Sequence, residues 1–142
     1  MVDKAAIDRM LENLKTYVAQ LDRLSGFGQD EFLSDPDKLG SAKYYLIIAI
    51  ESCLDISNHI ISSENLRRPT DFADTFAVLH ENGLIGKALE ERLQNMARFR
   101  NLLVHPYGKV DDKRVHEFLK TNLSDFDEFA KRIANAIDKS EH

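Results

Sequence analysis

The stretch YYLIIAIESCLDISNHII, residues 44–61, decides the fold of this chain. Its apolar residues fall on more than one side of a helix, which is typical of a helix buried in the middle of a protein. Pro36 stands shortly before it and favours the first turn of a helix, so we expect the central helix to cover about residues 37–63. Cys53 lies inside this apolar run, where a small core residue is a better explanation than a nucleophile.

One polar stripe interrupts the central helix. Glu51, Asp55 and His59 follow at intervals of four residues and therefore share a face. Buried charges need partners. A carboxylate–histidine metal site is conceivable at this spacing, but no second cluster of ligands is visible, and we assign no metal. Pairing of Glu51 or Asp55 with Arg100 is the simpler explanation of the stripe.

The sequence on both sides of the central helix is also helical in its periodicity. Apolar residues recur every three or four positions over residues 7–24 and again over about 86–105, which predicts two long amphipathic helices. A loop rich in Gly, Asp and Ser at residues 27–40 separates the first helix from the central one. We expect a short turn in this loop to be held against the bundle by Phe27, Phe32 and Leu33.

Two further helical stretches complete the chain. Thr70 is the expected N-cap of a short helix over residues 72–81, and the Asn-Gly pair at 82–83 should end it. The last region, residues 112–139, is periodic with a break at 122–124. No strand pattern, repeat or low-complexity tract is present. We predict an all-α protein, an up-and-down bundle of four long helices plus a short helix.

Composition fits one domain over residues 1–142, a length that can bury a core without disulfides. The lone cysteine excludes an intrachain disulfide framework and fits a reducing compartment. The N-terminus carries charge from its third residue and has no apolar leader. No run approaches the roughly 18 uninterrupted apolar residues of a membrane span. We therefore expect a cytoplasmic protein with no membrane segment.

The net charge of −5 argues against nucleic-acid binding, but it hides an asymmetry. Residues 87–120 contain eight basic and five acidic side chains, a balance of +3, so the remainder carries −8. This division permits a local anion-binding surface on an acidic body. Ordinary mixed solvated faces explain the charge equally well.

The segment RFRNLLVHPYGKV, residues 98–110, concentrates functional side chains at a helix end. Pro106 disfavours helix in the residue before it, so the helix should end at or just before His105. The helix dipole there favours a cation, which suits a histidine that donates or accepts a proton near neutral pH. Three apolar residues between the polar ones suggest that the segment packs against something: Leu102, Leu103 and Val104.

Helix geometry relates the polar groups of this segment to one another. Asn101 is one turn before His105 on the same face, close enough to orient its ring. Arg100 lies about 140° around the axis and roughly 7.5 Å along it from His105, so the two flank a groove that fits a phosphate. In the alternative interpretation, Arg100 pairs with a carboxylate of the central helix and His105 only caps a free carbonyl.

Three stretches of the sequence together resemble a known protein family. The pattern R-N-x3-H-x-Y at residues 100–107, the preceding ERLQNMARF at 91–99 and the upstream AIESCLDISNHII at 49–61 are together similar to the HEPN superfamily, specifically its HepT-type members. The resemblance covers most of the chain, to about residue 120. It implies a HEPN-like fold and a metal-independent endoribonuclease toxin of a type VII-like toxin–antitoxin pair, without a cofactor, acting on an RNA such as a tRNA or an mRNA.

The resemblance also implies roles for named residues at the cleft of a homodimer. His105 would transfer protons and Arg100 would stabilise the charged transition state, with Asn101, Glu51 and Asp55 in support. Two copies of the basic region, residues 87–120, would then face the RNA substrate together. Their combined positive charge would offset the net negative charge that argues against nucleic-acid binding.

Tyr107 resembles the tyrosine that a cognate minimal nucleotidyltransferase antitoxin modifies with AMP. AMP next to the histidine would block the substrate phosphate by charge and bulk. In the alternative interpretation, Tyr107 is a residue packed across the bundle. Two other functions stay open at this point, a non-catalytic helical partner that presents substrate to a nucleotidyltransferase, and a plain dimerising structural bundle.

Overall fold

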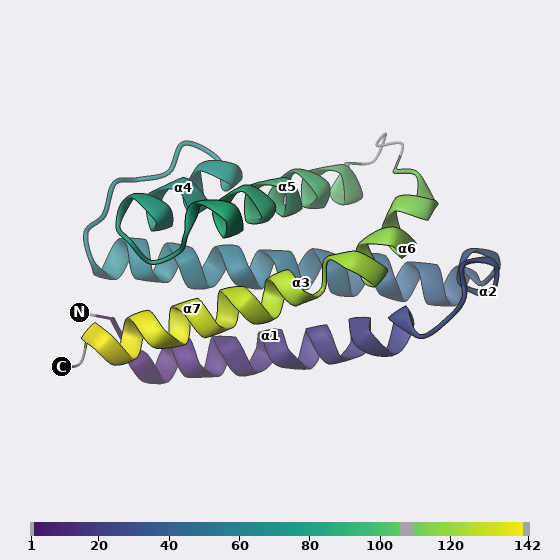
Figure 1. Cartoon of the computed structure of the whole chain (residues 1–142), viewed down its shortest axis with the longest axis horizontal. Coiled ribbons are helices and arrows are strands. Elements are labelled where there is room, and N and C mark those ends of the chain that lie inside the picture. Colours follow the sequence, from purple (N-terminus) through teal and green to yellow (C-terminus); the bar gives the residue numbers. More distant parts are fainter. Residues whose placement is uncertain (1, 106–109, 141–142) are drawn as a thin grey trace.

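A computed structural model of the chain describes residues 2–105 and 110–140 and is all-helical over them (Figure 1). Its four long helices confirm the predicted bundle: α1 (Lys4–Ser25), α3 (Pro36–Ser63), α5 (Lys87–Val104) and α7 (Ser124–Ser140). In Figure 1, α3 runs between α1 on one side and the α4–α5 pair on the other. This central position explains why its sequence is apolar around most of its circumference.

The number of short helices differs from the prediction of one. They are α2 (Gln29–Ser34), α4 (Phe72–Glu81) and α6 (Asp112–Thr121). α2 forms inside the expected loop because Phe32 is fully buried and its ring packs 5.2 Å from that of His116 in α6. α6 is separated from α7 at Asn122, its C-cap, which confirms the predicted break.

The central helix begins where proline predicts. Pro36 occupies its first turn, and the Asp35 side chain accepts hydrogen bonds from the backbone N–H groups of Asp37 and Lys38. Cys53 is fully buried, as expected of a core residue. By length and apolar content α3 alone among the described helices passes a test for a membrane span, but half of its most apolar window is buried inside the bundle. Helices at the core of a protein pass the same test.

The N-cap predicted at Thr70 is wrong. The cap is Asp71, whose carboxylate accepts a hydrogen bond of 2.7 Å from the backbone N–H of Asp74. A carboxylate caps as well as a hydroxyl and also favours the positive end of the helix dipole, so the residue one position later takes the role. Thr70 instead donates to the Asp74 side chain through its N–H and its hydroxyl. Gly83, with φ of +74°, follows the end of α4 as predicted.

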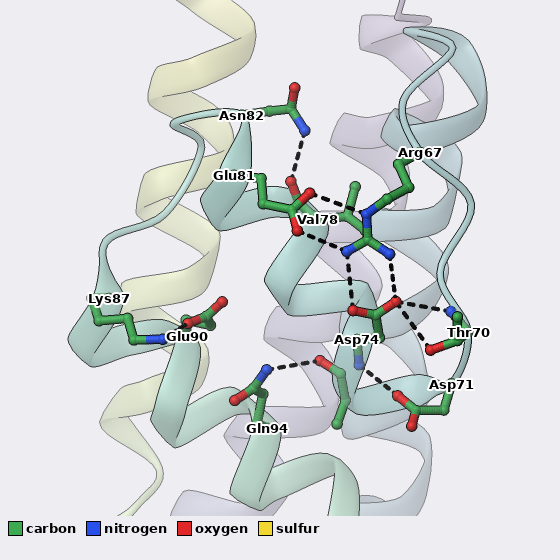
Figure 2. Close-up of polar contacts among 11 residues, drawn as sticks. Arg67, Thr70, Asp71, Asp74, Val78, Glu81, Asn82, Lys87, Glu90 and Gln94 are labelled. Atoms are coloured by element: carbon green, nitrogen blue, oxygen red, sulfur yellow. Dashed lines mark hydrogen bonds and ion pairs between the residues drawn. The ribbon is translucent and has the colours of Figure 1, made fainter.

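A charged cluster fastens the connection before α4 to the helix itself (Figure 2). The Arg67 guanidinium bridges two carboxylates that lie about two turns apart on the same face of α4, with 2.8 Å to Asp74 and 2.8 Å to Glu81. Gln94 of α5 donates to the Ala73 carbonyl at 3.2 Å and ties the start of α4 to α5. Together these contacts fix where Phe72, the first residue of α4, lies against α5.

We expect the Asp74→Asn variant to lose thermal stability at pH 7, with Tm lower by about 4 °C. Arg67 and the Thr70 backbone hold the pKa of the Asp74 carboxyl well below its usual range. A group with a lowered folded-state pKa stabilises the protein above its unfolded pKa of about 3.9, and that contribution fades as the pH falls towards the folded value. The Tm difference from wild type should therefore be full at pH 5 to 7 and shrink below pH 4 in calorimetric scans.

The Asp8→Asn variant, on an exposed position of α1, is the matched control and should show no such pH-dependent difference. A difference for Asp74→Asn that is equally large at pH 3 and pH 7 would contradict the assigned ion pair.

Candidate functional site at the end of α5

The third long helix, α5, ends as the proline predicts. α5 stops at Val104, and His105 is its C-cap with an extended backbone, φ −74° and ψ 122°. His105 is exposed, at the negative end of the helix dipole. Tyr107, the expected modification site, lies outside the described residues, as does Pro106.

Arg100 is held against the central helix. Its Nη2 and Nε donate to the same oxygen of Glu51, at 2.7 Å and 3.2 Å, and only 19% of its side chain is exposed. This confirms the predicted pairing with the central helix and identifies Glu51 as the partner. Asn101 accepts a hydrogen bond of 3.2 Å from Nη1 of Arg100. The contacts fix the direction of the guanidinium.

The arginine keeps donors for a further ligand. A guanidinium carries five N–H groups, and the three hydrogen bonds to Glu51 and Asn101 use one each on Nε, Nη1 and Nη2. One N–H on each terminal nitrogen therefore remains. Two such N–H groups match two oxygens of a phosphate, so the ion pair orients Arg100 without using up its capacity for an anion.

Phe72 is a member of this site that the sequence did not reveal. The guanidinium carbon of Arg100 lies over its ring, 5.1 Å from the centroid, yet the residue is 41% exposed. In the sequence, Phe72 stands one turn before Phe76, which is buried, and this spacing predicts that Phe72 is a core residue as well. The contact joins residues that are 28 positions apart, and no local pattern indicates a cation–π pair over such a separation.

The rest of the polar stripe on α3 is not bonded to Arg100. Asp55 is exposed; partial desolvation raises the pKa of its carboxyl, and the nearby charge of Glu51 adds to the effect. The Nε2 atom of His59 is buried and has no hydrogen-bond partner in the described part of the chain. No group of three or more potential metal ligands occurs among residues 2–105 and 110–140.

The apolar residues of the motif divide between two environments. Leu103 packs against the core, whereas Leu102 and Val104 are 40% and 41% exposed. They are among the few large apolar side chains at the described surface with such exposure. The expectation that this segment packs against something therefore holds within the chain for one of its three apolar residues.

Comparison with known proteins shows the family to which the chain belongs. The model of the family described as "Ribonuclease HepT-like" matches residues 14–133. The chain is 29% identical over 119 residues to the mRNA nuclease HepT of Shewanella oneidensis, covering 84% of this chain and 89% of that protein. It is 20% identical over 132 residues to the tRNA nuclease HepT of Aphanizomenon flos-aquae, covering 93% and 90% of the two.

The chain also resembles a solved structure in its fold. A tri-AMPylated HEPN toxin of Shewanella oneidensis in complex with its MNT antitoxin superposes with a TM-score of 0.85 and 29% identity, over 91% of this chain and 96% of that one. The family match, which spans most of the chain, and the all-helical architecture point the same way. This chain belongs to the HepT-like ribonuclease family and is a ribonuclease of the HEPN type.

Proposed function

We propose that this protein is the toxin of a toxin–antitoxin pair and that it cleaves RNA without a metal ion, using the R-x4-H motif formed by Arg100 and His105. The observation that supports the proposal is how Arg100 is held and where it lies relative to His105. The residue is fixed by Glu51 and Asn101, retains two N–H donors, and lies five residues before an exposed histidine at a helix end.

The chemistry that suits these groups is transesterification within the RNA. The ribose 2′-oxygen attacks the adjacent phosphorus and the bond to the 5′-oxygen breaks, which leaves a 2′,3′-cyclic phosphate and a 5′-hydroxyl. One imidazole takes the 2′-hydroxyl proton, and a second, protonated one gives a proton to the leaving oxygen. The remaining N–H groups of Arg100 stabilise the extra charge on the phosphoryl oxygens in the transition state. A histidine and an arginine thus supply both the proton transfers and the charge stabilisation.

Two imidazoles at one scissile bond imply two subunits. The motif supplies one histidine, His105, so we propose a homodimer whose two motifs face each other across a cleft. The exposed Leu102 and Val104 support this arrangement, because apolar side chains beside a charged site are well suited to a subunit contact.

The partner we propose is a minimal nucleotidyltransferase antitoxin that transfers AMP to Tyr107, with both proteins in the cytoplasm. Support comes from the solved HEPN toxin, which is tri-AMPylated and in complex with an MNT antitoxin. In that transfer the tyrosine oxygen attacks the α-phosphorus of ATP and pyrophosphate leaves. A non-catalytic role beside a nucleotidyltransferase is not favoured, because the relatives are named as nucleases.

The test is cleavage of RNA by the purified chain in the presence of EDTA. We expect cleavage that EDTA does not inhibit and fragments that end in a cyclic phosphate, detected by their resistance to polyadenylation until the cyclic end is removed. Cleavage that stops in EDTA and returns with added magnesium would contradict the metal-independent mechanism.

The same assay tests the composite site. A heterodimer of wild-type and His105→Ala subunits, isolated through two different tags, should retain less than about a tenth of the wild-type rate if both histidines act on one bond. Two independent sites would leave about half of the rate. A matched heterodimer with Arg132→Ala, an exposed arginine of α7, controls for the tagging and isolation.

A further inference from the structure

We propose that Phe72 is a specificity-determining residue, on which the ribonuclease stacks an unpaired nucleobase of its substrate, so that it acts on single-stranded rather than duplex RNA. The inference rests on the proposed function, because it requires that Arg100 binds the substrate phosphate. It assigns a role to a residue that lies outside the R-x4-H motif and on another helix.

The position of the ring is the first argument. Arg100 lies over one face of Phe72 with its guanidinium carbon 5.1 Å from the centroid. Phe72 as a whole residue nevertheless keeps 41% of its surface accessible, although phenylalanine is among the residue types most often buried. When Arg100 binds the phosphate of a nucleotide, the base of that nucleotide therefore lies near this ring. The phosphate-binding guanidinium and the exposed phenyl ring are spaced as the phosphate and the base of one nucleotide are.

The rigidity of the ring is the second argument. The backbone next to it is held to α5 by the hydrogen bond from Gln94 to the Ala73 carbonyl, and the Arg67 cluster fixes the connection that precedes it. Asp71 caps the helix at the same point. A stacking surface held in place loses little entropy when a ligand binds.

The chemistry of recognition is the third argument. Ribonucleic acid is read in single strands by stacking of unpaired bases on aromatic side chains, while bases in a duplex are already stacked and their faces are covered. One exposed phenyl ring beside a phosphate-binding arginine is sufficient for one base and carries no hydrogen-bond donors to select among the four. The ring thus explains a preference for unpaired RNA without strong base preference.

Binding of a non-cleavable probe tests this role. The probe is a single-stranded 2′-O-methyl oligonucleotide that contains 2-aminopurine, which lacks the attacking hydroxyl and whose fluorescence falls on stacking. We expect Phe72→Leu to weaken its binding by about tenfold and to abolish the fluorescence change, and Phe72→Trp to retain both. The matched control is Tyr44→Leu, which removes a second exposed aromatic, 58% accessible, on α3 and should bind as wild type does. The same probe annealed to its complement should bind weakly to every variant.

Kinetics on cleavable RNA distinguish stacking from a purely structural role of the ring. Loss of stacking raises KM and leaves kcat within about twofold, because Arg100 is held by Glu51 independently of the ring. Equal binding by Phe72→Leu and wild type, a fall in kcat at unchanged KM, or dissociation of the dimer in sedimentation would each overturn the inference. If Arg100→Ala still cleaves normally, the proposed function itself fails; if Arg100→Ala is inactive and Phe72→Leu binds normally, only the inference fails.

Discussion

The Arg100→Ala variant is expected to cleave RNA about 100- to 1,000-fold more slowly than wild type, and His105→Ala about 100- to 10,000-fold more slowly. In the proposed mechanism, Arg100 donates to charge that develops in the transition state, and His105 moves the proton without which the 2′-oxygen is a poor nucleophile. Single-turnover rates with saturating protein report these losses without interference from product release. Arg132→Ala, an exposed arginine on α7, should cleave at the wild-type rate.

Lysine at the same position separates charge from geometry. Arg100→Lys keeps the positive charge but lacks the planar fork that holds Glu51 on one edge and leaves an N–H on each terminal nitrogen. We expect it to remain at least about tenfold below wild type. Wild-type cleavage by either Arg100→Ala or His105→Ala would exclude the motif from catalysis.

Glu51 is a positioning residue in this scheme, because it acts through Arg100. Glu51→Gln keeps an acceptor oxygen for the guanidinium but removes the charge, and we expect cleavage to fall by about tenfold because the weaker, uncharged hydrogen bonds hold the guanidinium less firmly. If Glu51 instead competed with the substrate phosphate for Arg100, the same substitution would accelerate cleavage. The sign of the change therefore decides between the two roles.

Most of the fold could be predicted because its signals are local. The periodicity of α1, α3 and α5 and the proline at the start of α3 depend on neighbouring residues in the sequence. α2 was not predictable in this way, since six residues show too little periodicity and the helix depends on the burial of Phe32 against α6. The cap of α4 was misplaced by one residue because Thr70 and Asp71 are both good caps, and the backbone conformation decides between them.

In the site, too, the features with a local sequence signal could be predicted and those that depend on tertiary packing could not. The pairing of Arg100 with the central helix was predictable from electrostatics, because a carboxylate on an apolar helix requires a partner. Neither the choice of Glu51 over Asp55 nor the contact with Phe72 has a local signal, since both depend on how three helices meet. Sequence indicates which groups need a partner, and tertiary packing selects it.

Transfer of AMP to Tyr107 is expected to reduce RNA cleavage by at least about 100-fold, an effect as large as removal of a catalytic group. A phosphodiester there adds negative charge two residues along the chain from His105 and seven from Arg100, the two groups that the proposed mechanism assigns to the substrate phosphate. The modifying phosphate and the scissile phosphate would compete for the same donors, and the adenosine would add bulk at the cleft.

Co-expression with a minimal nucleotidyltransferase of the MNT antitoxin type, followed by intact-mass measurement and the cleavage assay, checks this expectation. The wild-type chain should gain whole AMP units and lose activity together, whereas Tyr107→Phe should gain no AMP at that position and stay active after the same treatment. Tyr44→Phe controls for the loss of an exposed tyrosine elsewhere and should be modified and inhibited as wild type is. Inhibition of Tyr107→Phe to the same extent as wild type, without added mass, would show that the partner acts by binding alone, since the cleft can also be closed by a protein that covers Arg100 and His105.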